Sequence, residues 1–260
     1  MAERFWLGTG WKMNKTRTQA AAYCATLRAA PELAALPLQL FVLPPFTALA
    51  EVATALADTA VMVGAQNCHW ATAGAWTGEI SAGQVADCGA VLVELGHSER
   101  RAHFGETNAL INAKVKAALA AGLTPLVCVG ETAEERDLDA ASVSVARQAR
   151  MALSGLAAAD LERVLLAYEP VWAIGDGGEP ATPAYAGAIH GVIKQAVTDL
   201  LGTAPPLLYG GSVNPDNATA LAGEPEIDGL FVGRAAWQAE GLLGLARQVA
   251  AVVEGKVDRY

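Results

Sequence analysis

Residues 206–237, PLLYGGSVNPDNATALAGEPEIDGLFVGRAAW, show the repeating unit of this chain most clearly. The stretch contains two short apolar runs, and each run is followed by glycine and then by residues that can begin a helix. Pro215 is well placed for the first turn of the helix after the first run. Because strands that alternate with helices form parallel sheets, this stretch predicts an α/β fold.

The same unit recurs along the whole chain. Seven alanine-rich or amphipathic segments separate eight short apolar runs, and one more such segment follows the last run. Nearly continuous apolar strands predict a parallel sheet that is covered on both faces. Eight such units in about 250 residues are typical of a closed (β/α)8 barrel, which we predict here. The eight runs are RFWLGTGW (4–11), LQLFVLP (38–44), AVMVGAQN (60–67), AVLVELG (90–96), TPLVCVG (124–130), VLLAYEP (164–170), PLLYGG (206–211) and GLFVG (229–233).

An open, doubly wound sheet is the alternative architecture. That fold usually carries a GxGxxG dinucleotide-binding motif after its first strand. The first run leads instead into TGWKMN (9–14), which lacks this motif. No linker-like or low-complexity segment divides the chain, so we predict one domain that spans residues 1–260.

The composition argues against several kinds of partner. Of the 260 residues, 53% are hydrophobic and 17% are charged, and the formal net charge is -9 with no lysine- or arginine-rich run. Nucleic acids and anionic membranes need a basic surface, so we expect neither as a partner. The N-terminus lacks the pattern of a secretory signal, and no apolar stretch is long enough to span a bilayer.

The four cysteines, Cys24, Cys68, Cys88 and Cys128, are far apart and form no CxxC pair. A chain of this length folds without disulfides, so we expect reduced thiols and a cytoplasmic location. Cys68 and His69 could form half of a metal site, but no second pair follows them. We therefore predict neither a metal site nor a cofactor.

Polar residues at the ends of three runs predict a catalytic site, because the carboxyl ends of barrel strands carry the chemistry of such folds. Lys12 follows the first run, His97 follows the fourth and Glu169 lies near the end of the sixth. A carboxylate base, an imidazole and an ammonium suit the transfer of a proton between carbons beside a carbonyl group. Each residue alone could be a surface cation, a helix cap or a salt-bridge partner. Their shared position at strand ends favours catalysis.

The last two units predict a phosphate site. Free backbone N–H groups at the start of a helix, together with the helix dipole, bind phosphate. Gly210, Gly211 and Gly233 would let a ligand approach the backbone closely. The segment VWAIGDGGEPATP (171–183) has rigid ends and a glycine-rich centre, which favours a lid that closes over a ligand. A plain surface loop is the alternative.

With these residues in view, the chain resembles the triosephosphate isomerase family over essentially its whole length. The motifs that carry the resemblance are WKMN, GAQN, TGEIS, GHSERR, CVGET, AYEPVWAIG, YGGSVNP and DGLFVG. The resemblance implies a (β/α)8 (TIM) barrel in which Glu169 is the base, His97 the electrophile and Lys12 the electrostatic residue. It also implies that Glu99, in the HSER motif, supports Lys12.

The resemblance further implies that backbone around Gly175, Ser212 and Gly233 holds a substrate phosphate, under a lid that begins near Pro170. No metal or other cofactor is needed for this chemistry.

The family is usually dimeric, with the loop that carries GAWTGE reaching into the neighbouring subunit near its active site. Thr77 and Arg100 match positions that meet across this interface. Trp76 is larger than the usual Phe, and the partner surface would have to accommodate it. The resemblance therefore implies a homodimer.

Three departures from the family pattern concern the substrate. Gly10 stands where the family has an Asn whose amide meets the substrate oxygens. Loss of that amide should weaken binding of a triose, or of its transition state, by about 1 to 3 kcal/mol. The lid reads GDGGEPATP (175–183), one residue longer than the usual type, and Arg234 replaces the customary second glycine after the last run. Arg234 either adds a cation for the phosphate or points to solvent.

The missing side chain at Gly10 also leaves room beside the reacting carbon, since Gly10 and Lys12 face the same side of the strand and Trp11 faces the other. A ketotetrose phosphate differs from dihydroxyacetone phosphate by a hydroxymethyl group on that carbon. The segments GTGWKMNKT, CHW and GRAAW resemble the branch of the family that interconverts L-erythrulose 1-phosphate and D-erythrulose 4-phosphate. We therefore predict an isomerase of four-carbon sugar phosphates. The alternatives are an authentic triosephosphate isomerase, in which Gly10 relieves backbone crowding, and a barrel that binds a phosphosugar without turnover.

Overall fold

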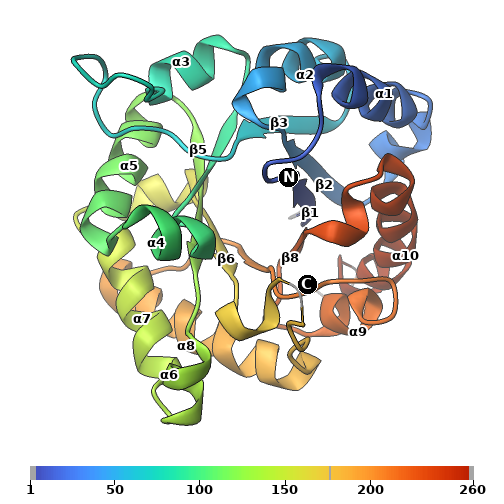
Figure 1. The fold of residues 1–260 in the computed structure, drawn as a ribbon. Coiled ribbons are helices and arrows are strands. Elements are labelled where there is room, and N and C mark those ends of the chain that lie inside the picture. The colour runs from blue at the N-terminus through green and yellow to red at the C-terminus, as the bar shows by residue number, and fades with distance from the viewer. Residues whose placement is uncertain (1–3, 176, 258–260) are drawn as a thin grey trace.

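Eight parallel strands close into a barrel in the computed structural model, which describes residues 4–175 and 177–257 (Figure 1). All eight strands fall within the eight apolar runs, so the predicted (β/α)8 barrel is confirmed and the open-sheet alternative is wrong. Of the predicted domain 1–260, residues 1–3, 176 and 258–260 lie outside the described residues. The strands are β1 (Phe5–Gly10), β2 (Leu38–Leu43), β3 (Val61–Ala65), β4 (Leu92–Leu95), β5 (Thr124–Val129), β6 (Leu165–Tyr168), β7 (Leu207–Tyr209) and β8 (Gly229–Val232).

Helices alternate with the strands and surround the barrel (Figure 1). Local sequence sets where they begin. The Thr16 side chain accepts a hydrogen bond from the Gln19 N–H, and the Gln19 side chain accepts one from the Thr16 N–H, which satisfies free donors at the start of α1. The α-helices are α1 (Arg17–Arg28), α2 (Leu49–Leu56), α3 (Ala82–Asp87), α4 (Ser98–Phe104), α5 (Asn108–Ala120), α6 (Ala133–Asp137), α7 (Ala141–Ala152), α8 (Pro183–Leu201), α9 (Ala218–Gly223) and α10 (Ala239–Val257). Short 3-10 helices are η1 (Pro31–Ala35), η2 (Phe46–Ala48), η3 (Ala158–Arg163), η4 (Val171–Ala173) and η5 (Arg234–Ala236).

The helix after β7 begins later than predicted. It begins at Ala218, so Pro215 lies in the turn that precedes α9 and not in its first turn. The side-chain oxygen of Asn214 accepts hydrogen bonds from the N–H groups of Asp216 at 2.9 Å and Asn217 at 3.3 Å. An Asn side chain that binds the backbone in this way stabilises a turn in competition with a helix.

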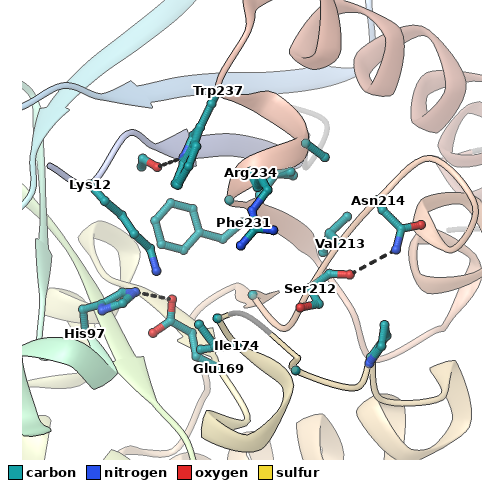
Figure 2. Close-up of a pocket in the computed structure, with 18 of the residues that line it drawn as sticks. Lys12, His97, Glu169, Ile174, Ser212, Val213, Asn214, Phe231, Arg234 and Trp237 are labelled. Atoms are coloured by element: carbon teal, nitrogen blue, oxygen red, sulfur yellow. Dashed lines mark hydrogen bonds and ion pairs between the residues drawn. The ribbon is translucent and has the colours of Figure 1, made fainter. Parts of the chain in front are cut away.

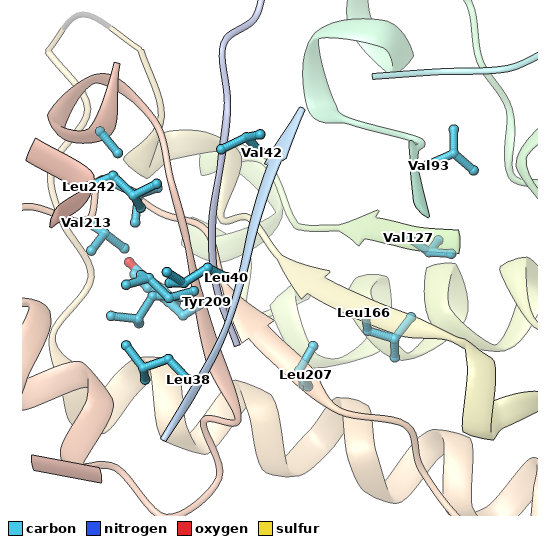
Figure 3. Close-up of a cluster of buried hydrophobic side chains, with 14 of the residues drawn as sticks. Leu38, Leu40, Val42, Val93, Val127, Leu166, Leu207, Tyr209, Val213 and Leu242 are labelled. Atoms are coloured by element: carbon cyan, nitrogen blue, oxygen red, sulfur yellow. The ribbon is translucent and has the colours of Figure 1, made fainter. Parts of the chain in front are cut away.

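Two apolar layers explain why the strands are apolar along their whole length. In β2, Leu38, Leu40 and Val42 belong to the layer between strands and helices (Figure 3). Phe41 and Leu43 of the same strand belong to the layer inside the barrel. Each strand is therefore buried on both faces, as predicted for a parallel sheet with helices around it. The interior layer also contains Leu92, Leu126, Cys128, Leu165, Ala167, Leu208 and Phe231.

The alternation of side chains along β1 is confirmed. Gly10 faces the inside of the barrel, where it lines a cavity. Trp11 faces the opposite way, is fully buried, and packs on Tyr23 of α1 with ring centroids 4.7 Å apart. The indole N–H of Trp237 donates to the carbonyl of Gly10 at 3.0 Å and fixes this end of the strand.

The four cysteines are free, and three of them are buried. His69 has a structural role: its Nδ1 accepts a hydrogen bond from the Ala71 N–H at 3.0 Å, and its ring stacks on Trp70. Among the helices of the described residues, none combines the length and the apolar character needed to cross a membrane.

Candidate active site

A cavity of about 480 Å³ lies at the carboxyl ends of the barrel strands (Figure 2). Two predicted residues lie outside its lining: Gly211, and Glu99, which contacts Lys12. The structure therefore brings the other predicted residues together in one place. Those that line the cavity are Gly10, Lys12, His97, Glu169, Gly175, Ser212, Gly233 and Arg234.

Glu169 directly follows β6 and is almost completely buried, with 3% of its surface exposed. Its Oε1 lies 3.6 Å from Nε2 of His97, and its Oε2 has no hydrogen-bond partner among the described residues. Gly210 makes this position possible, because a Cβ atom there would lie 2.9 Å from Cγ of Glu169. The carboxylate is held in the cavity with one oxygen unengaged, as a general base requires.

His97 caps the N-terminus of α4, and its Nδ1 accepts a hydrogen bond from the Glu99 N–H at 3.1 Å. Burial lowers the pKa of His97, but the negative charges of Glu169 and Glu94 outweigh burial and make the net direction upward. The hydrogen bond acts against protonation, since it exists only while Nδ1 lacks a proton. We give this direct hydrogen bond more weight than the charges of Glu169 and Glu94, which favour protonation. We therefore assign a neutral imidazole with its proton on Nε2, the nitrogen nearer Glu169.

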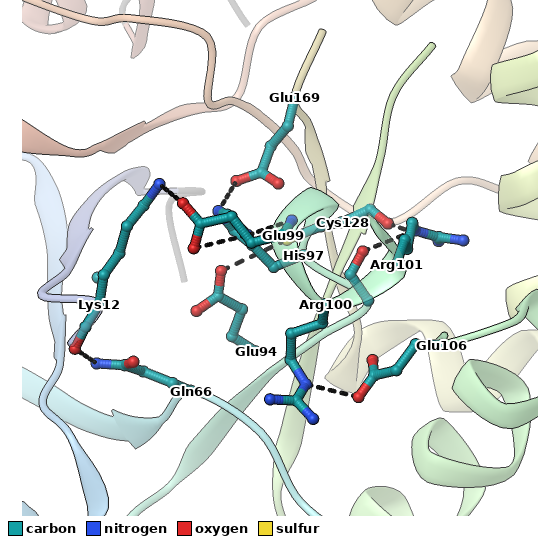
Figure 4. A network of polar contacts seen from close by, with 12 residues as sticks. Lys12, Gln66, Glu94, His97, Glu99, Arg100, Arg101, Glu106, Cys128 and Glu169 are labelled. Carbon is teal, nitrogen blue, oxygen red and sulfur yellow. Dashed lines mark hydrogen bonds and ion pairs between the residues drawn. The ribbon is translucent and has the colours of Figure 1, made fainter. Parts of the chain in front are cut away.

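Lys12 enters the cavity from an unusual backbone conformation. Its φ angle is 53°, in the left-handed region, which costs about 1 to 2 kcal/mol for a residue with a side chain. Gln66 holds this segment by donating from Nε2 to the carbonyls of Lys12 at 3.0 Å and Leu43 at 2.9 Å. The Lys12 ammonium lies 2.5 Å from Oε1 of Glu99 (Figure 4). Partial burial raises the pKa of Glu99, but the Lys12 hydrogen bond and the nearby positive charges make the net shift downward.

The opposite end of the cavity is suited to an anion. Ser212 also has a left-handed φ angle, 50°, and its hydroxyl donates to the carbonyl of Ala173. Apart from chain neighbours, no heavy atom of the described residues lies within 4 Å of the position that a Cβ would take at Gly175 or Gly233. A ligand can therefore approach the backbone N–H groups there. Figure 2 shows the Arg234 side chain pointing into the cavity, where it adds a positive charge.

The predicted lid, residues 171–183, contributes one wall of the cavity. Nε1 of Trp172 donates to Oε1 of the fully buried Glu131 at 2.8 Å, and the Tyr185 hydroxyl donates to the same oxygen at 3.2 Å. One carboxylate thus anchors the segment on both sides of its glycine-rich centre. Asp176, within that centre, lies outside the described residues.

Comparison with known proteins places this site in a family. A sequence profile described as Triosephosphate isomerase matches residues 5–249. The chain belongs to the triosephosphate isomerase family. Its relatives include the L-erythrulose-1-phosphate isomerase of Rhizobium rhizogenes, 50% identical over 253 residues that cover 97% of each chain. The L-erythrulose-1-phosphate isomerase of Mesorhizobium japonicum is 50% identical over 250 residues, which cover 96% of this chain and 98% of that one.

Comparison with solved structures gives the same family. The crystal structure of triosephosphate isomerase from Bartonella henselae matches with a TM-score of 0.83 and 34% sequence identity, covering 94% of this chain and 98% of that chain. Membership of the triosephosphate isomerase family confirms the predicted resemblance, and with it that this chain is an enzyme, a sugar phosphate isomerase.

Several side chains in the cavity are not anticipated from the sequence. Glu94, Ile174, Phe231 and Trp237 all line it. A signal for Glu94 was available, because a carboxylate in the middle of the apolar run AVLVELG is exceptional in a strand that is buried on both faces. Ile174 lies in the predicted lid, although the sequence does not single it out. Phe231 and Trp237 are ordinary aromatic residues, and nothing in the sequence separates them from the core.

Glu94, Cys128 and Glu169 each offer a possible metal-ligand atom, and these atoms lie within 4.8 Å of one another. Burial first, and then the charges of Glu169 and Glu94, raise the pKa of the Cys128 thiol well above its usual value. A thiol that keeps its proton is a poor metal ligand. This chemistry favours the prediction of no metal, which stays a prediction.

The buried carboxyl group of Glu94 predicts a pH dependence of stability. Burial raises the pKa of Glu94 from 4.5 to about 7, and the negative charge of Glu169 acts in the same direction. Positive charge at His97 and Lys12 lowers this pKa, but burial outweighs it. Between these pH values the folded chain keeps a proton that the unfolded chain releases, so the free energy of unfolding falls as pH rises. The loss reaches about 3 kcal/mol by neutral pH and does not grow further above it.

The variant Glu94→Gln lacks this titration. We expect the difference in unfolding free energy between the variant and the parent to shift in favour of the variant from pH 5 to pH 7, and then to stay constant to pH 8. Urea unfolding at each pH measures it. Stability curves that run parallel from pH 5 to pH 8 would contradict the raised pKa.

The residues predicted to meet a partner subunit lie on the outside of the barrel. Trp76 is 47% exposed and packs edge-on against Trp70, with ring centroids 5.4 Å apart. Thr77 is exposed beside it, on the loop that projects from the barrel before α3 (Figure 1). Arg100, on α4, donates from Nε to Oε1 of Glu106 at 2.6 Å. Their role in assembly stays a prediction.

Proposed function

We propose that this enzyme interconverts L-erythrulose 1-phosphate and D-erythrulose 4-phosphate. The observation that carries the proposal is the open position at Gly10, beside Glu94 and in the same cavity as Lys12, His97 and Glu169. Space and a polar group at this point suit a substrate with a hydroxymethyl group on its reacting carbon. Relatives that are 50% identical over nearly the whole chain carry the name L-erythrulose-1-phosphate isomerase, which supports the same substrate.

Glu169 is the proposed base. In L-erythrulose 1-phosphate the carbonyl group is at C2, and the proton to be moved is on C3. The Glu169 carboxylate takes that proton, the electrons of the C3–H bond form a C2–C3 double bond, and the carbonyl electrons move onto the C2 oxygen. The unengaged, buried Oε2 of Glu169 supports this assignment.

Lys12 and His97 are proposed to stabilise the enediolate that forms. The Lys12 ammonium offsets the negative charge on the C2 oxygen. Nε2 of His97 gives its proton to that oxygen and takes one from the C3 hydroxyl. Glu169 then returns its proton to C2, which leaves the carbonyl group at C3. Counted from the other end, the product is D-erythrulose 4-phosphate, and no proton is gained or lost.

The phosphate group is proposed to bind at the opposite end of the cavity. Backbone around Gly175, Ser212 and Gly233 can donate hydrogen bonds to its oxygens, and the Arg234 side chain can add charge-assisted ones. Holding the phosphate there fixes the distance of the reacting carbons from Glu169. The binding energy of the phosphate is thereby used to orient the substrate.

Deuterium uptake from heavy water, followed by NMR at carbon-bound positions, tests the proposed function. The enzyme is incubated separately with L-erythrulose 1-phosphate and dihydroxyacetone phosphate, with Glu169→Gln as the control. We expect fast exchange and isomerisation of the tetrose and slow turnover of the triose. Fast turnover of the triose alone would make the enzyme a triosephosphate isomerase, and binding without exchange would make it a non-catalytic barrel.

The variant Gly10→Asn is expected to shift the preference toward trioses. A Cβ atom at position 10 would lie 3.3 Å from Cζ of Phe231 and 3.6 Å from Oε2 of Glu94. An Asn side chain therefore fills the space that the fourth carbon needs, while its amide offers the triose a hydrogen bond. We expect the ratio of kcat/KM for the tetrose to that for the triose to fall by about tenfold to a hundredfold.

Steady-state kinetics with both substrates measure this ratio. Gly10→Ala is the matched variant, because it adds bulk without an amide, and its ratio should lie between those of the parent and Gly10→Asn. An equal loss of activity on both substrates would show that the space at Gly10 does not select the substrate.

We also infer a homodimer in the cytoplasm. The dimer is supported by exposed apolar side chains: Trp76, on the loop before α3, is 47% exposed, and Met13, directly after Lys12, is 98% exposed. The four free cysteines support a reducing compartment. Trp76, Thr77 and Arg100 are the proposed interface residues.

A further inference from the structure

Glu94 is a carboxyl group inside the barrel that the proposed proton transfer does not use. It lies on β4, is 5% exposed and lines the cavity. Within the described chain, its hydrogen-bond donor is the thiol of Cys128, with Sγ 3.7 Å from Oε1. A thiol is a weak donor, so the cost of burying this carboxyl group is poorly compensated by the protein itself. Buried polar groups normally have partners, which points to a ligand as the missing one.

Gly10 leaves this carboxyl group open to the cavity. Oε2 of Glu94 lies 3.6 Å from the position that a Cβ atom would take at residue 10. Phe231 bounds the same position from β8, with Cζ 3.3 Å away. A side chain at residue 10 would therefore occupy space directly beside Oε2. The open position and the carboxyl group form one feature, with contributions from β1, β4 and β8.

The carboxyl group of Glu94 is close to the reacting carbons. One of its oxygens lies within 4.8 Å of a carboxylate oxygen of Glu169, and Figure 4 shows it close to both His97 and Glu169. A base must approach the carbon from which it takes a proton. A hydroxymethyl group on that carbon places its hydroxyl only two bonds away, which is within reach of Glu94.

The carboxyl group of Glu94 is suited to form a hydrogen bond with a substrate hydroxyl. A carboxylate accepts a hydrogen bond from a hydroxyl, and a neutral carboxylic acid can also donate one. Burial raises the pKa of Glu94 to about 7, so both forms are present near neutral pH. A substrate without the fourth carbon has no hydroxyl at this point and leaves the carboxyl group unpaired. Sites built to bind a hydroxyl discriminate strongly against the analogue that lacks it.

We propose that Glu94 binds the terminal hydroxyl of the fourth carbon and, together with the open position at Gly10, selects four-carbon over three-carbon sugar phosphates. The proposal rests on the proposed function and names a specificity-determining residue for it. Glu94 acts through this hydroxyl and not through the proton that Glu169 transfers.

Paired changes in enzyme and substrate test the proposal. The enzyme forms are the parent, Glu94→Val, which removes the polar group, and Glu94→Gln, which keeps a donor and an acceptor. The substrates are L-erythrulose 1-phosphate and its 4-deoxy analogue, in which a methyl group replaces the hydroxymethyl group. Thr9→Val is the matched control, because Thr9 is buried next to Gly10 but does not line the cavity.

In the parent and in Thr9→Val, we expect kcat/KM to fall by about tenfold to a hundredfold when the hydroxyl is removed from the substrate. In Glu94→Val the two substrates should differ by less than about threefold, since the partner of the hydroxyl is gone. Glu94→Gln should recover most of the discrimination. A structural role for Glu94 would lower activity on both substrates alike and leave their ratio unchanged.

Two results would overturn the proposal. Equal discrimination by the parent and Glu94→Val would show that another group binds the hydroxyl, and equal activity of the parent on the two substrates would show that nothing does. If Glu94→Val does not fold, Glu94→Met, which also removes the polar group but keeps most of the side-chain length, takes its place in the same comparison with the same expected result. Failure of the parent to turn over L-erythrulose 1-phosphate would instead refute the proposed function.

Discussion

Glutamine in place of Glu169 is expected to lower kcat for L-erythrulose 1-phosphate by about a hundredfold to ten-thousandfold. The amide keeps the size and position of the side chain but cannot accept the proton from C3. Since the phosphate end of the cavity is untouched, we expect KM to change much less than kcat. Deuterium exchange into the substrate should be lost together with isomerisation, because both need the same proton transfer. Steady-state kinetics and NMR measure the two effects.

Glu169→Asp is the matched variant for this experiment. It keeps the negative charge but withdraws the carboxylate by one methylene group, away from the position that Gly210 leaves open for Cγ. We expect its kcat to lie between those of the parent and Glu169→Gln, because proton transfer depends on close approach. Loss of less than about tenfold in Glu169→Gln would mean that another group is the base.

The architecture could be predicted from the sequence because each strand is buried on both faces. Runs such as LQLFVLP and TPLVCVG are continuous in apolar residues, and their regular alternation with helical segments leaves few arrangements other than a closed barrel. The turn after β7 could not be placed so well. A proline is compatible with the first turn of a helix, but Asn214 bonds to the backbone of Asp216 and holds Pro215 in a preceding turn.

Some residues of the candidate site could be predicted from the sequence and others could not. Lys12, His97 and Glu169 follow strands, and barrel topology alone brings the ends of parallel strands to one face. Glu94 was missed because it lies within a strand, so its position in the cavity depends on which face of β4 points inward.

The relation of Gly10 to Glu94 is harder to predict still. The two residues lie on strands that are not neighbours in the sheet: Gly10 is on β1, which pairs with β2 and β8, and Glu94 is on β4, which pairs with β3 and β5. A distance across the inside of a barrel depends on closure and register, which a single sequence does not specify. The space at Gly10 is accordingly narrower than the sequence suggests, because Phe231 occupies part of it.

Methionine in place of Lys12 is expected to lower kcat/KM by about a hundredfold to a thousandfold. The side chain keeps nearly its length and its apolar stem, but the positive charge that offsets the enediolate is lost. The protein maintains this charge at some cost: the backbone of Lys12 is left-handed, and Gln66 has to donate a hydrogen bond to the Lys12 carbonyl to support it.

The variant Glu99→Gln tests how much the placement of the Lys12 side chain matters while its positive charge is kept. Glu99 contacts the ammonium at 2.5 Å but lies outside the lining of the cavity, so it can hold Lys12 without touching the substrate. We expect this variant to lose less than about tenfold in kcat/KM, because the ammonium stays and an amide oxygen can still accept its hydrogen bond. Equal loss of activity in Lys12→Met and Glu99→Gln would show that the intact ion pair is what the site requires. It would contradict the prediction that the positive charge of Lys12 alone stabilises the enediolate.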